Sequence, residues 1–372
     1  MKGFGVIGLA LAGSVLWTCC GAGHRDAADP ALRQYAFISN EQSDTVTVVD
    51  LETFQVRHTV PVGKNPTRII ASPIRSEIYV VNTGSETLAV LNANSLKVES
   101  TIPLGRSPSS LELSNDGKTG YVTNSGSDDL SVVDLIERHV RTTVVTGREP
   151  SQARVSSDGK LLVVSNRGDD TISIVDLSRF QKLVDVKVGS RPGPMVILPD
   201  NSQLFVGNTG SNNVSVVDLK SFKLITHLDS GKAPMDLALK PDAGELFVTN
   251  SQSDSVTIVN TNADEVEENL MAGSNPGRAV VNQEGTILYY SNSGSNAVSA
   301  VDIYSRRVLA SVSVGTHPDL LVLTPDERYL LVLDRQSNDL AVVDAVAKTL
   351  FTLVPLGFAP RDLAIKAVTS KF

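Results

Sequence analysis

The residues of this 372-residue chain that could do chemistry are basic side chains beside one short motif. A Gly-x-x-Pro motif occurs eight times at a constant step of 42 residues, from Gly63 to Gly357. The five positions after each glycine hold eight lysines and arginines, about twice the number that their share of the chain would place there. Arginine presents a planar fork of donors that suits phosphate, sulfate and carboxylate groups. The sequence therefore predicts an anion-binding site built from these loops.

The predicted ligand-binding residues are these eight cations and one histidine from the same loops. They are Lys64, Arg68, Arg106, Arg148, Arg191, Lys232, Arg278, His317 and Arg361. The alternative is that these cations only pair with neighbouring carboxylates, and such surface pairs contribute ~0–1 kcal/mol each. The expected ligand is an acidic glycan, a phosphate-bearing polymer or single-stranded nucleic acid. Against nucleic acid stands the scarcity of aromatic side chains near the loops, because bases need stacking platforms.

Other side chains that carry chemistry in proteins are not arranged for it here. Four histidines lie within the repeats, but each occupies a different repeat position, so they are not expected to converge on one metal ion or haem. Neither a G-x-S-x-G nucleophile motif nor a G-x-x-x-x-G-K-[ST] phosphate loop occurs. Asp128–Asp129 and Asp169–Asp170 could contribute to a calcium site, but a calcium cage takes roughly six to eight oxygen ligands. The sequence thus predicts no metal, no cofactor and no catalytic residue.

A 42-residue repeat positions the loops. Each unit carries an asparagine, or in the last unit an aspartate, at the end of its first apolar run. These residues are Asn40, Asn82, Asn124, Asn166, Asn208, Asn250, Asn292 and Asp334. A fixed period of this length indicates a solenoid, a propeller or an array. A serine or aspartate follows three positions later, such as Ser85, and is predicted to close its own turn by a side chain-to-backbone hydrogen bond.

Each unit contains four short runs rich in Val, Ile, Leu and Thr, which indicates four β-strands. In the first unit the runs are 35–40, 45–50, 56–63 and 68–72. Short Asp–Gly and Asn–Gly turns favour antiparallel hairpins, and four antiparallel strands form one propeller blade. We therefore predict an all-β fold, a β-propeller of eight four-stranded blades. Three N-terminal strands and one C-terminal strand should complete one blade together. Seven blades are the alternative, but they would leave one copy of the repeat unplaced.

Tyr121-Val122-Thr123-Asn124, followed by Asp134, Gly147 and Pro150, resembles the YVTN β-propeller repeat of YncE-like and surface-layer proteins. The resemblance extends over residues 35–367, although only one copy spells the four letters in full. It implies a propeller fold and export from the cytoplasm. It does not imply one activity, because the family name marks a scaffold.

The first 22 residues are predicted to be a secretory or lipoprotein signal segment. Lys2 precedes an apolar run of 15 residues, which is shorter than the roughly 20 residues that a membrane-spanning helix needs. The run ends in Leu16-Trp17-Thr18-Cys19, which resembles a bacterial lipobox and makes Cys19 the predicted site of lipid and membrane attachment. Cleavage after Ala22 would instead release a soluble protein. We expect an exported protein, either a periplasmic or cell-envelope lipoprotein or a secreted one.

The rest of the chain divides into three parts. Residues 23–34 are small and polar and are predicted to be a flexible tether. Residues 35–367 form the single propeller domain, and 368–372 a C-terminal tail. Because repeats of this kind share one continuous core, we expect one domain and a monomer.

Three functions are compatible with these features. The formal net charge of −8 provides no general polycation, so any anion site has to be local. We favour an exported, non-catalytic binding or scaffolding propeller with an anion-attracting channel mouth. The first alternative is a lactonase-like hydrolase, for which His317, Asp319 and Glu149 are the available residues. The second is a structural protein of the cell envelope or surface layer.

Overall fold

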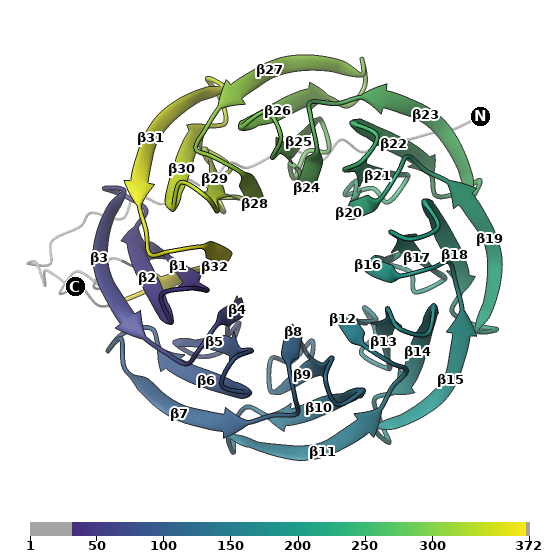
Figure 1. Ribbon diagram of the computed structural model, residues 1–372, viewed down its shortest axis with the longest axis horizontal. Coiled ribbons are helices and arrows are strands. Elements are labelled where there is room, and N and C mark those ends of the chain that lie inside the picture. The colour runs from purple at the N-terminus through teal and green to yellow at the C-terminus, as the bar shows by residue number, and fades with distance from the viewer. Residues whose placement is uncertain (1–31, 370–372) are drawn as a thin grey trace, which may run out of the picture. The chain divides into compact units, whose positions relative to one another are not determined.

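The computed structural model describes residues 32–369. The predicted signal segment, Cys19 and the tether up to residue 31 lie outside the described residues, as do residues 370–372. Within 32–369 the chain forms eight antiparallel sheets of four strands each, arranged in a ring (Figure 1). No helix long and apolar enough to cross a bilayer occurs in this part of the chain. The predicted all-β propeller of eight blades is confirmed.

The innermost strand of each blade lines the centre of the ring and begins at the proline of a Gly-x-x-Pro motif (Figure 1). These strands are β4 (Pro66–Ala71), β8 (Pro108–Leu113), β12 (Pro150–Val155), β16 (Pro192–Ile197), β20 (Pro234–Leu239), β24 (Pro276–Val281), β28 (Pro318–Leu323) and β32 (Pro360–Val368). The second strands end at the repeated asparagine or at Asp334. They are β1 (Arg33–Asn40), β5 (Glu77–Asn82), β9 (Thr119–Asn124), β13 (Leu161–Asn166), β17 (Gln203–Asn208), β21 (Glu245–Asn250), β25 (Ile287–Asn292) and β29 (Tyr329–Asp334).

The third and fourth strands complete each blade towards the rim (Figure 1). The third strands are β2 (Thr45–Asp50), β6 (Thr87–Asn92), β10 (Asp129–Asp134), β14 (Thr171–Asp176), β18 (Asn213–Asp218), β22 (Ser255–Asn260), β26 (Ala297–Asp302) and β30 (Asp339–Asp344). The outermost strands are β3 (Gln55–Pro61), β7 (Val98–Pro103), β11 (His139–Val145), β15 (Gln181–Lys187), β19 (Lys223–Asp229), β23 (Glu265–Met271), β27 (Arg307–Ser313) and β31 (Thr349–Pro355).

The core lies between neighbouring blades. The second and third strands are almost entirely buried, as in β5, where all six residues are buried, because each sheet is covered on both faces by its neighbours. One cluster joins Tyr79 and Val81 of β5 to Leu111 of β8 and Val122 of β9 in the next blade. This arrangement explains why apolar residues occupy consecutive positions in the sequence instead of alternating.

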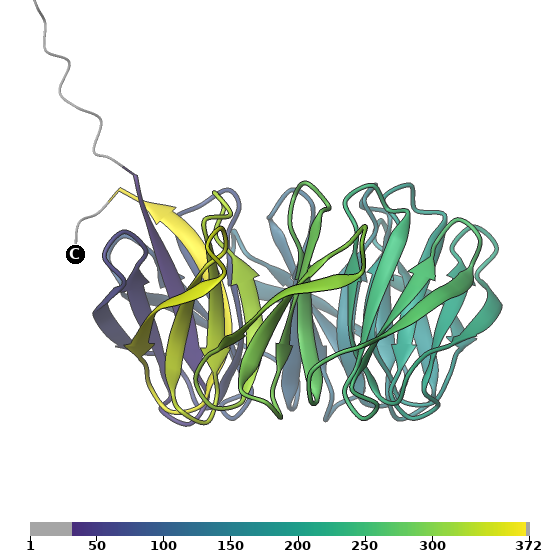
Figure 2. The ribbon, with the colours of Figure 1, turned by 90° about the horizontal axis from the view of Figure 1, so that it is seen from above.

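The two ends of the described chain close the ring. β32 pairs antiparallel with β1, so that Tyr35 lies opposite Lys366 and Phe37 opposite Ala364. The resulting sheet has the strand order β3-β2-β1-β32, and the purple and yellow strands lie side by side in Figures 1 and 2. Three strands from one end and one from the other thus build this blade, as predicted.

The repeated asparagines are buried structural residues. Asn40 is fully buried and its Nδ2 donates to Thr45 Oγ1 at 3.1 Å and Thr47 Oγ1 at 2.8 Å. In the second blade the Oδ1 of Asn82 accepts the N–H of Gly63 at 3.2 Å. A Cβ on Gly63 would lie 2.5 Å from the Asn82 side chain, so the glycine is needed for this close approach.

Side-chain acceptors from two turns hold the Gly-x-x-Pro loop in six of the eight units. The N–H of Lys64 donates to Ser85 Oγ at 3.0 Å, and the N–H of Asn65 donates to Asp44 Oδ1 at 2.8 Å. Ser85 lies in the turn of the blade that the loop enters, whereas Asp44 lies in the turn of the blade that it leaves. The prediction that the serine closes its own turn was wrong, because its hydroxyl clamps a neighbouring loop instead. The aspartates after the third strands do cap their own turns, as where Asp134 Oδ1 accepts the N–H of Ile136 at 3.0 Å.

Candidate functional site

The Gly-x-x-Pro loops offer a ligand their side chains but few backbone donors. The clamping hydrogen bonds recur around the ring, as in the 3.1 Å bond from the N–H of Arg106 to Ser127 Oγ. In the next loop the N–H of Glu149 donates to Asp128 Oδ1 at 2.9 Å. Since these N–H groups already have acceptors, the loops do not form the open backbone nests that bind anions in other proteins.

Most of the predicted ligand-binding residues of the loops lie outside the central channel. Lys64, Arg106, Arg148, Arg191 and Lys232 are all exposed, and none of them lines the channel pocket described below. Of these five, Arg148 alone has a side-chain partner within residues 32–369, a salt bridge to Asp169 in the turn between β13 and β14. These residues form an exposed set of cations on the loop-bearing face. Their role as ligand contacts stays a prediction.

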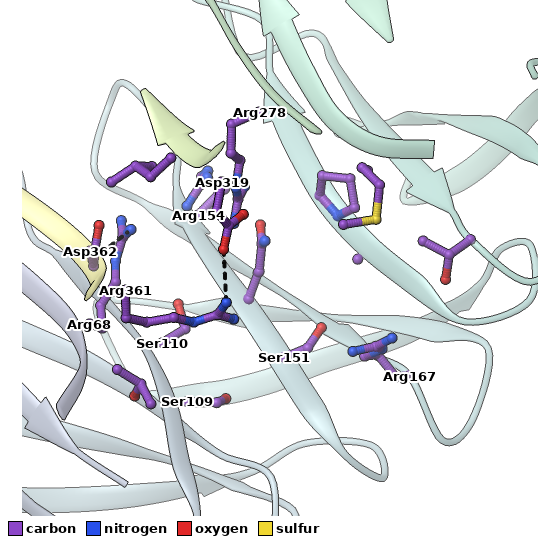
Figure 3. A pocket seen from close by; sticks show the side chains of 17 residues that line it. Arg68, Ser109, Ser110, Ser151, Arg154, Arg167, Arg278, Asp319, Arg361 and Asp362 are labelled. Atoms are coloured by element: carbon purple, nitrogen blue, oxygen red, sulfur yellow. Dashed lines mark hydrogen bonds and ion pairs between the residues drawn. The ribbon is translucent and has the colours of Figure 1, made fainter. Parts of the chain in front are cut away.

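A pocket of about 360 Å³ lies among the inner strands and receives the other predicted arginines (Figure 3). Its lining includes three of the predicted residues, Arg68, Arg278 and Arg361. It also includes two arginines that were not predicted, Arg154 and Arg167. Hydroxyl groups complete the polar lining, including those of Ser109, Ser110 and Ser151. The arginines come from β4, β12, β24 and β32 and from one turn, so residues far apart in the sequence meet in one space.

Each of the four arginines on the inner strands pairs with a carboxylate of the preceding blade. The pairs are Arg68–Asp362 at 3.2 Å, Arg154–Glu112 at 3.5 Å, Arg278–Asp236 at 3.2 Å and Arg361–Asp319 at 3.1 Å, measured from Nη1 to a carboxylate oxygen. Figure 3 shows the Arg361 side chain reaching Asp319, with Arg68 beside Asp362. Inside the channel these cations therefore do pair with neighbouring acids, as the alternative to ligand binding requires.

Three of these carboxylates also bind the backbone of the next inner strand. Asp362 Oδ2 accepts the N–H of Ile69 at 2.9 Å, and Asp236 Oδ2 accepts the N–H of Ala279 at 3.0 Å. Glu112 Oε1 accepts the N–H of Val155 at 3.4 Å. The acids thus fasten neighbouring inner strands together, and part of their hydrogen-bonding capacity is used by the backbone.

The four guanidinium groups retain most of their donors. An arginine has five N–H donors, and each of these four contacts the protein through Nη1 alone among the described residues. The Nε of Arg68 is buried without a partner in the same part of the chain. Their side chains are about one-third exposed, and all four line the channel pocket. A ligand with several acceptor oxygens could satisfy their free N–H groups.

Arg154 carries the least compensated charge of the four. Burial lowers the pKa of the Arg154 guanidinium; the charges of Glu112 and Asp236 offset this only in part, and the positive charges of Arg68 and Arg278 lower the pKa further. At Arg278, by contrast, the charge of Asp236 is the main influence and raises the pKa. Binding of an anion beside Arg154 would therefore be favoured, because its negative charge would offset both the desolvation of the guanidinium and the repulsion among the arginines.

The charge of the channel is mixed, with a small positive excess. The five arginines that line the pocket outnumber its two lining aspartates, Asp319 and Asp362. Glu112 and Asp236 lie just behind, so nearly all of the charge is balanced. The arrangement suits one anionic group with several oxygens, which can be bound by free donors in a space of low dielectric.

Sequence reasoning missed Arg154 and Arg167. Arg154 lies seven residues after its glycine, beyond the five positions that were considered, but a signal was present. Its column is apolar in six units, for example Ile70 and Val196, and charged only at Glu112 and Arg154. A charged pair in an otherwise apolar column of adjacent units could have identified both residues. Arg167 stands where most units have serine or threonine, which is a weaker signal.

The residues considered for hydrolysis do not share a pocket. Asp319 lines the channel, whereas His317 lines a second pocket of about 340 Å³ formed by loops of neighbouring blades. Glu149 is exposed in its loop and lines neither space. No group of three or more histidine, cysteine, aspartate or glutamate side chains suited to a metal ion occurs in residues 32–369.

Comparisons with known proteins agree with this architecture. The YNCE-like beta-propeller family model matches residues 97–229, and the eight-bladed ring continues the same repeat on both sides. The molecule is thus a β-propeller. The predicted resemblance is confirmed over this stretch, because residues 97–229 match the YNCE-like beta-propeller family model. No curated protein matches it in sequence.

Several solved structures share the fold at low sequence identity. Hydrazine synthase of Kuenenia stuttgartiensis is 23% identical with a TM-score of 0.61, and the match covers 77% of this chain and 97% of that one. Dihydro-heme d1 dehydrogenase NirN, in complex with DHE, is 15% identical with a TM-score of 0.76 and coverages of 91% and 76%. Apo AztD of Citrobacter koseri is 14% identical with a TM-score of 0.69 and coverages of 92% and 100%. At these identities the likeness concerns the fold alone.

Proposed function

We propose that the protein is an exported, non-catalytic binding propeller that takes an anionic group of its ligand into the central channel. The ligand is a phosphate-bearing polymer or an acidic glycan whose charged group enters between the inner strands. The exposed loop cations, such as Arg106 and Lys232, attract the rest of the polymer from a distance. A lipid on Cys19 would hold the propeller at a membrane surface of the envelope.

The observation that carries this proposal is the state of Arg154. Its guanidinium lies in the channel with a single acidic partner at 3.5 Å, and burial lowers its pKa. A purely structural ion pair would be expected to satisfy its cation more fully, as a bidentate pair does. Arg68, Arg278 and Arg361 line the same small pocket as Arg154. Their free N–H groups therefore also support binding of an anion in this pocket.

Calorimetric titration with tripolyphosphate tests the proposal. We expect binding to the wild-type protein that weakens at high salt, because phosphate contacts are electrostatic. Arg154→Gln should weaken binding by about ten-fold, since a hydrogen bond to a charged group contributes ~1.5–3 kcal/mol. Arg154→Lys should fall between the two, because lysine keeps the charge but loses the planar fork.

Two sets of four substitutions, which remove the same amount of charge, distinguish binding in the channel from binding at the loops. The channel set replaces Arg68, Arg154, Arg278 and Arg361 by glutamine. The loop set replaces Lys64, Arg106, Arg191 and Lys232, which are exposed and have no side-chain partner within residues 32–369. We expect the channel set to abolish binding and the loop set to reduce mainly the association rate. Equal affinity losses in the two sets would contradict a site in the channel.

A further inference from the structure

The second pocket lies where the repeat departs most from its own pattern. It has a volume of about 340 Å³ and lies between the blade β28–β31 and the blade that closes the ring. Its lining residues are Gln42, His317, Arg335, Gln336, Asn338, Phe358 and Ala359. These residues belong to the same loops and turns that occur in every blade. The comparison between blades therefore shows which side chains are specific to this place.

Phe358 is the clearest departure. The position directly after the motif glycine holds lysine, arginine, serine or threonine in the other seven units, as at Lys64 and Thr316. The Phe358 side chain is 65% exposed at the pocket. Its backbone is held like that of the other loops, because its N–H donates to Ser43 Oγ at 2.7 Å. The loop thus presents an aromatic ring to solvent from a backbone that is held in place.

Glutamine replaces glycine in both turns that flank the pocket. The second residue of this turn is glycine in five units, and it packs closely on the neighbouring loop. A Cβ at Gly84 would lie 3.0 Å from Asn65 Oδ1, and one at Gly294 would lie 2.6 Å from Ser274 Oγ. At the positions of Gln42 and Gln336, a residue with a long side chain replaces this glycine. Neither side-chain amide has a hydrogen-bond partner among the described residues, so each presents a free donor and a free acceptor.

The pocket carries little net charge. Arg335 forms a salt bridge with Glu41, which neutralises the one guanidinium in its lining. Asn338 is used by the protein, since its Oδ1 accepts the N–H of Ala359 at 2.8 Å. What remains for a ligand is an apolar ring, two free amides and the imidazole of His317. This composition differs from the arginine-lined channel and does not favour an anion.

We propose that this pocket binds a neutral saccharide unit. The C–H face of a pyranose ring is apolar and fits against the exposed Phe358 ring. The hydroxyl groups at its edge each donate and accept, which matches the free amides of Gln42 and Gln336. An apolar surface combined with a few placed polar groups is the usual composition of a small-molecule site. The site is separate from the channel and does not depend on the function proposed for it.

Saturation-transfer NMR on the purified protein tests this site with maltose, cellobiose and diacetylchitobiose as probes. We expect saturation transfer to at least one of these disaccharides. Phe358→Lys and the double change Gln42→Gly with Gln336→Gly restore residues that other blades have at the same positions, so the fold should be retained. Each should weaken binding by at least about ten-fold, the equivalent of ~1.4 kcal/mol.

Gln252→Gly is the matched control. Gln252 occupies the same turn position as Gln42, but the loop beside it carries Lys232 instead of an aromatic residue. This variant and the channel set should bind the disaccharide like the wild type, which separates this proposal from the anion site. The proposal is overturned if none of the three disaccharides binds, or if binding survives Phe358→Lys. It is also overturned if short oligothymidylate, and no sugar, binds in a manner that Phe358→Lys abolishes.

Discussion

Asp334→Asn should stabilise the protein at neutral pH, because it removes an acid from a site that every other blade fills with an amide. Asp334 is fully buried at the end of β29. In the blade β8–β11 the equivalent Asn124 donates from Nδ2 to Asp129 Oδ1 at 2.6 Å. Asp334 instead faces the carboxyl of Asp339, and both of their Oδ1 atoms are buried without another partner. We infer that a proton shared between the two carboxyls allows them to lie together.

The magnitude follows from the pKa of Asp334. Burial raises this pKa from 3.8 to about 8, the hydrogen bond to Asp339 and its charge raise it as well, and the N–H of Gly315 lowers it. Because the pKa is higher in the folded state, the stability contribution is present below pH 3.8 and is lost as the pH rises to about 8. Each unit of pKa is worth about 1.4 kcal/mol, which bounds the loss at roughly 6 kcal/mol.

Urea unfolding at a series of pH values measures this effect. We expect Asp334→Asn to raise the free energy of unfolding by a few kcal/mol at pH 8 and to change it little near pH 4. The converse variant, Asn124→Asp, places a second carboxyl beside Asp129 and should introduce a new loss of stability over the same pH range. If the free energies of unfolding of wild type and Asp334→Asn depend on pH in the same way, the inference of a shared proton is wrong.

The remaining predictions concern the framework. Gly189→Ala should destabilise the fold by about 1–3 kcal/mol in urea unfolding, because its Cβ would lie 2.4 Å from Ser211 Oγ; a smaller change would mean that the loop can move away. Asp362→Asn should lower stability by about 1–3 kcal/mol through its bonds to Arg68 and the Ile69 N–H, with thermal unfolding as the measurement. Ending the chain before β32 should abolish cooperative unfolding, because β1 then keeps only β2 as a partner and the ring is left open; an unchanged transition would contradict the closure.

Much of the fold could be predicted from the sequence because the repeat fixes both strand order and register. The constant step from Asn40 to Asp334 left no insertion that could change the number of blades. The last strand of the repeat region follows a Gly-x-x-Pro motif, as the innermost strand of every blade does. This position predicted how the ring closes. The role of Ser85 could not be predicted, because its partner Lys64 lies 21 residues away and is brought close only when β4 pairs with β5.

The candidate site was harder to predict for a physical reason. A basic residue one position after the motif glycine, such as Arg106, lies in an exposed loop, whereas one that lies four or five positions after the glycine lines the channel. Arg68 and Arg106 therefore look alike in sequence although their surroundings differ. The partial compensation of the Arg154 charge depends on Glu112 and Asp236 and on the opposing charges of Arg68 and Arg278, which all lie on other inner strands. Such a charge balance exists only once the blades are assembled.

The most direct test of the anion site is the location of a single bound selenate in crystals of the protein, found by its anomalous scattering. The account predicts selenate in the channel, within hydrogen-bonding distance of Arg154 and of one or more of Arg68, Arg278 and Arg361. The peak should disappear in Arg154→Gln and persist in the loop set. Selenate bound only at the exposed loop cations, with none in the channel, would contradict the account.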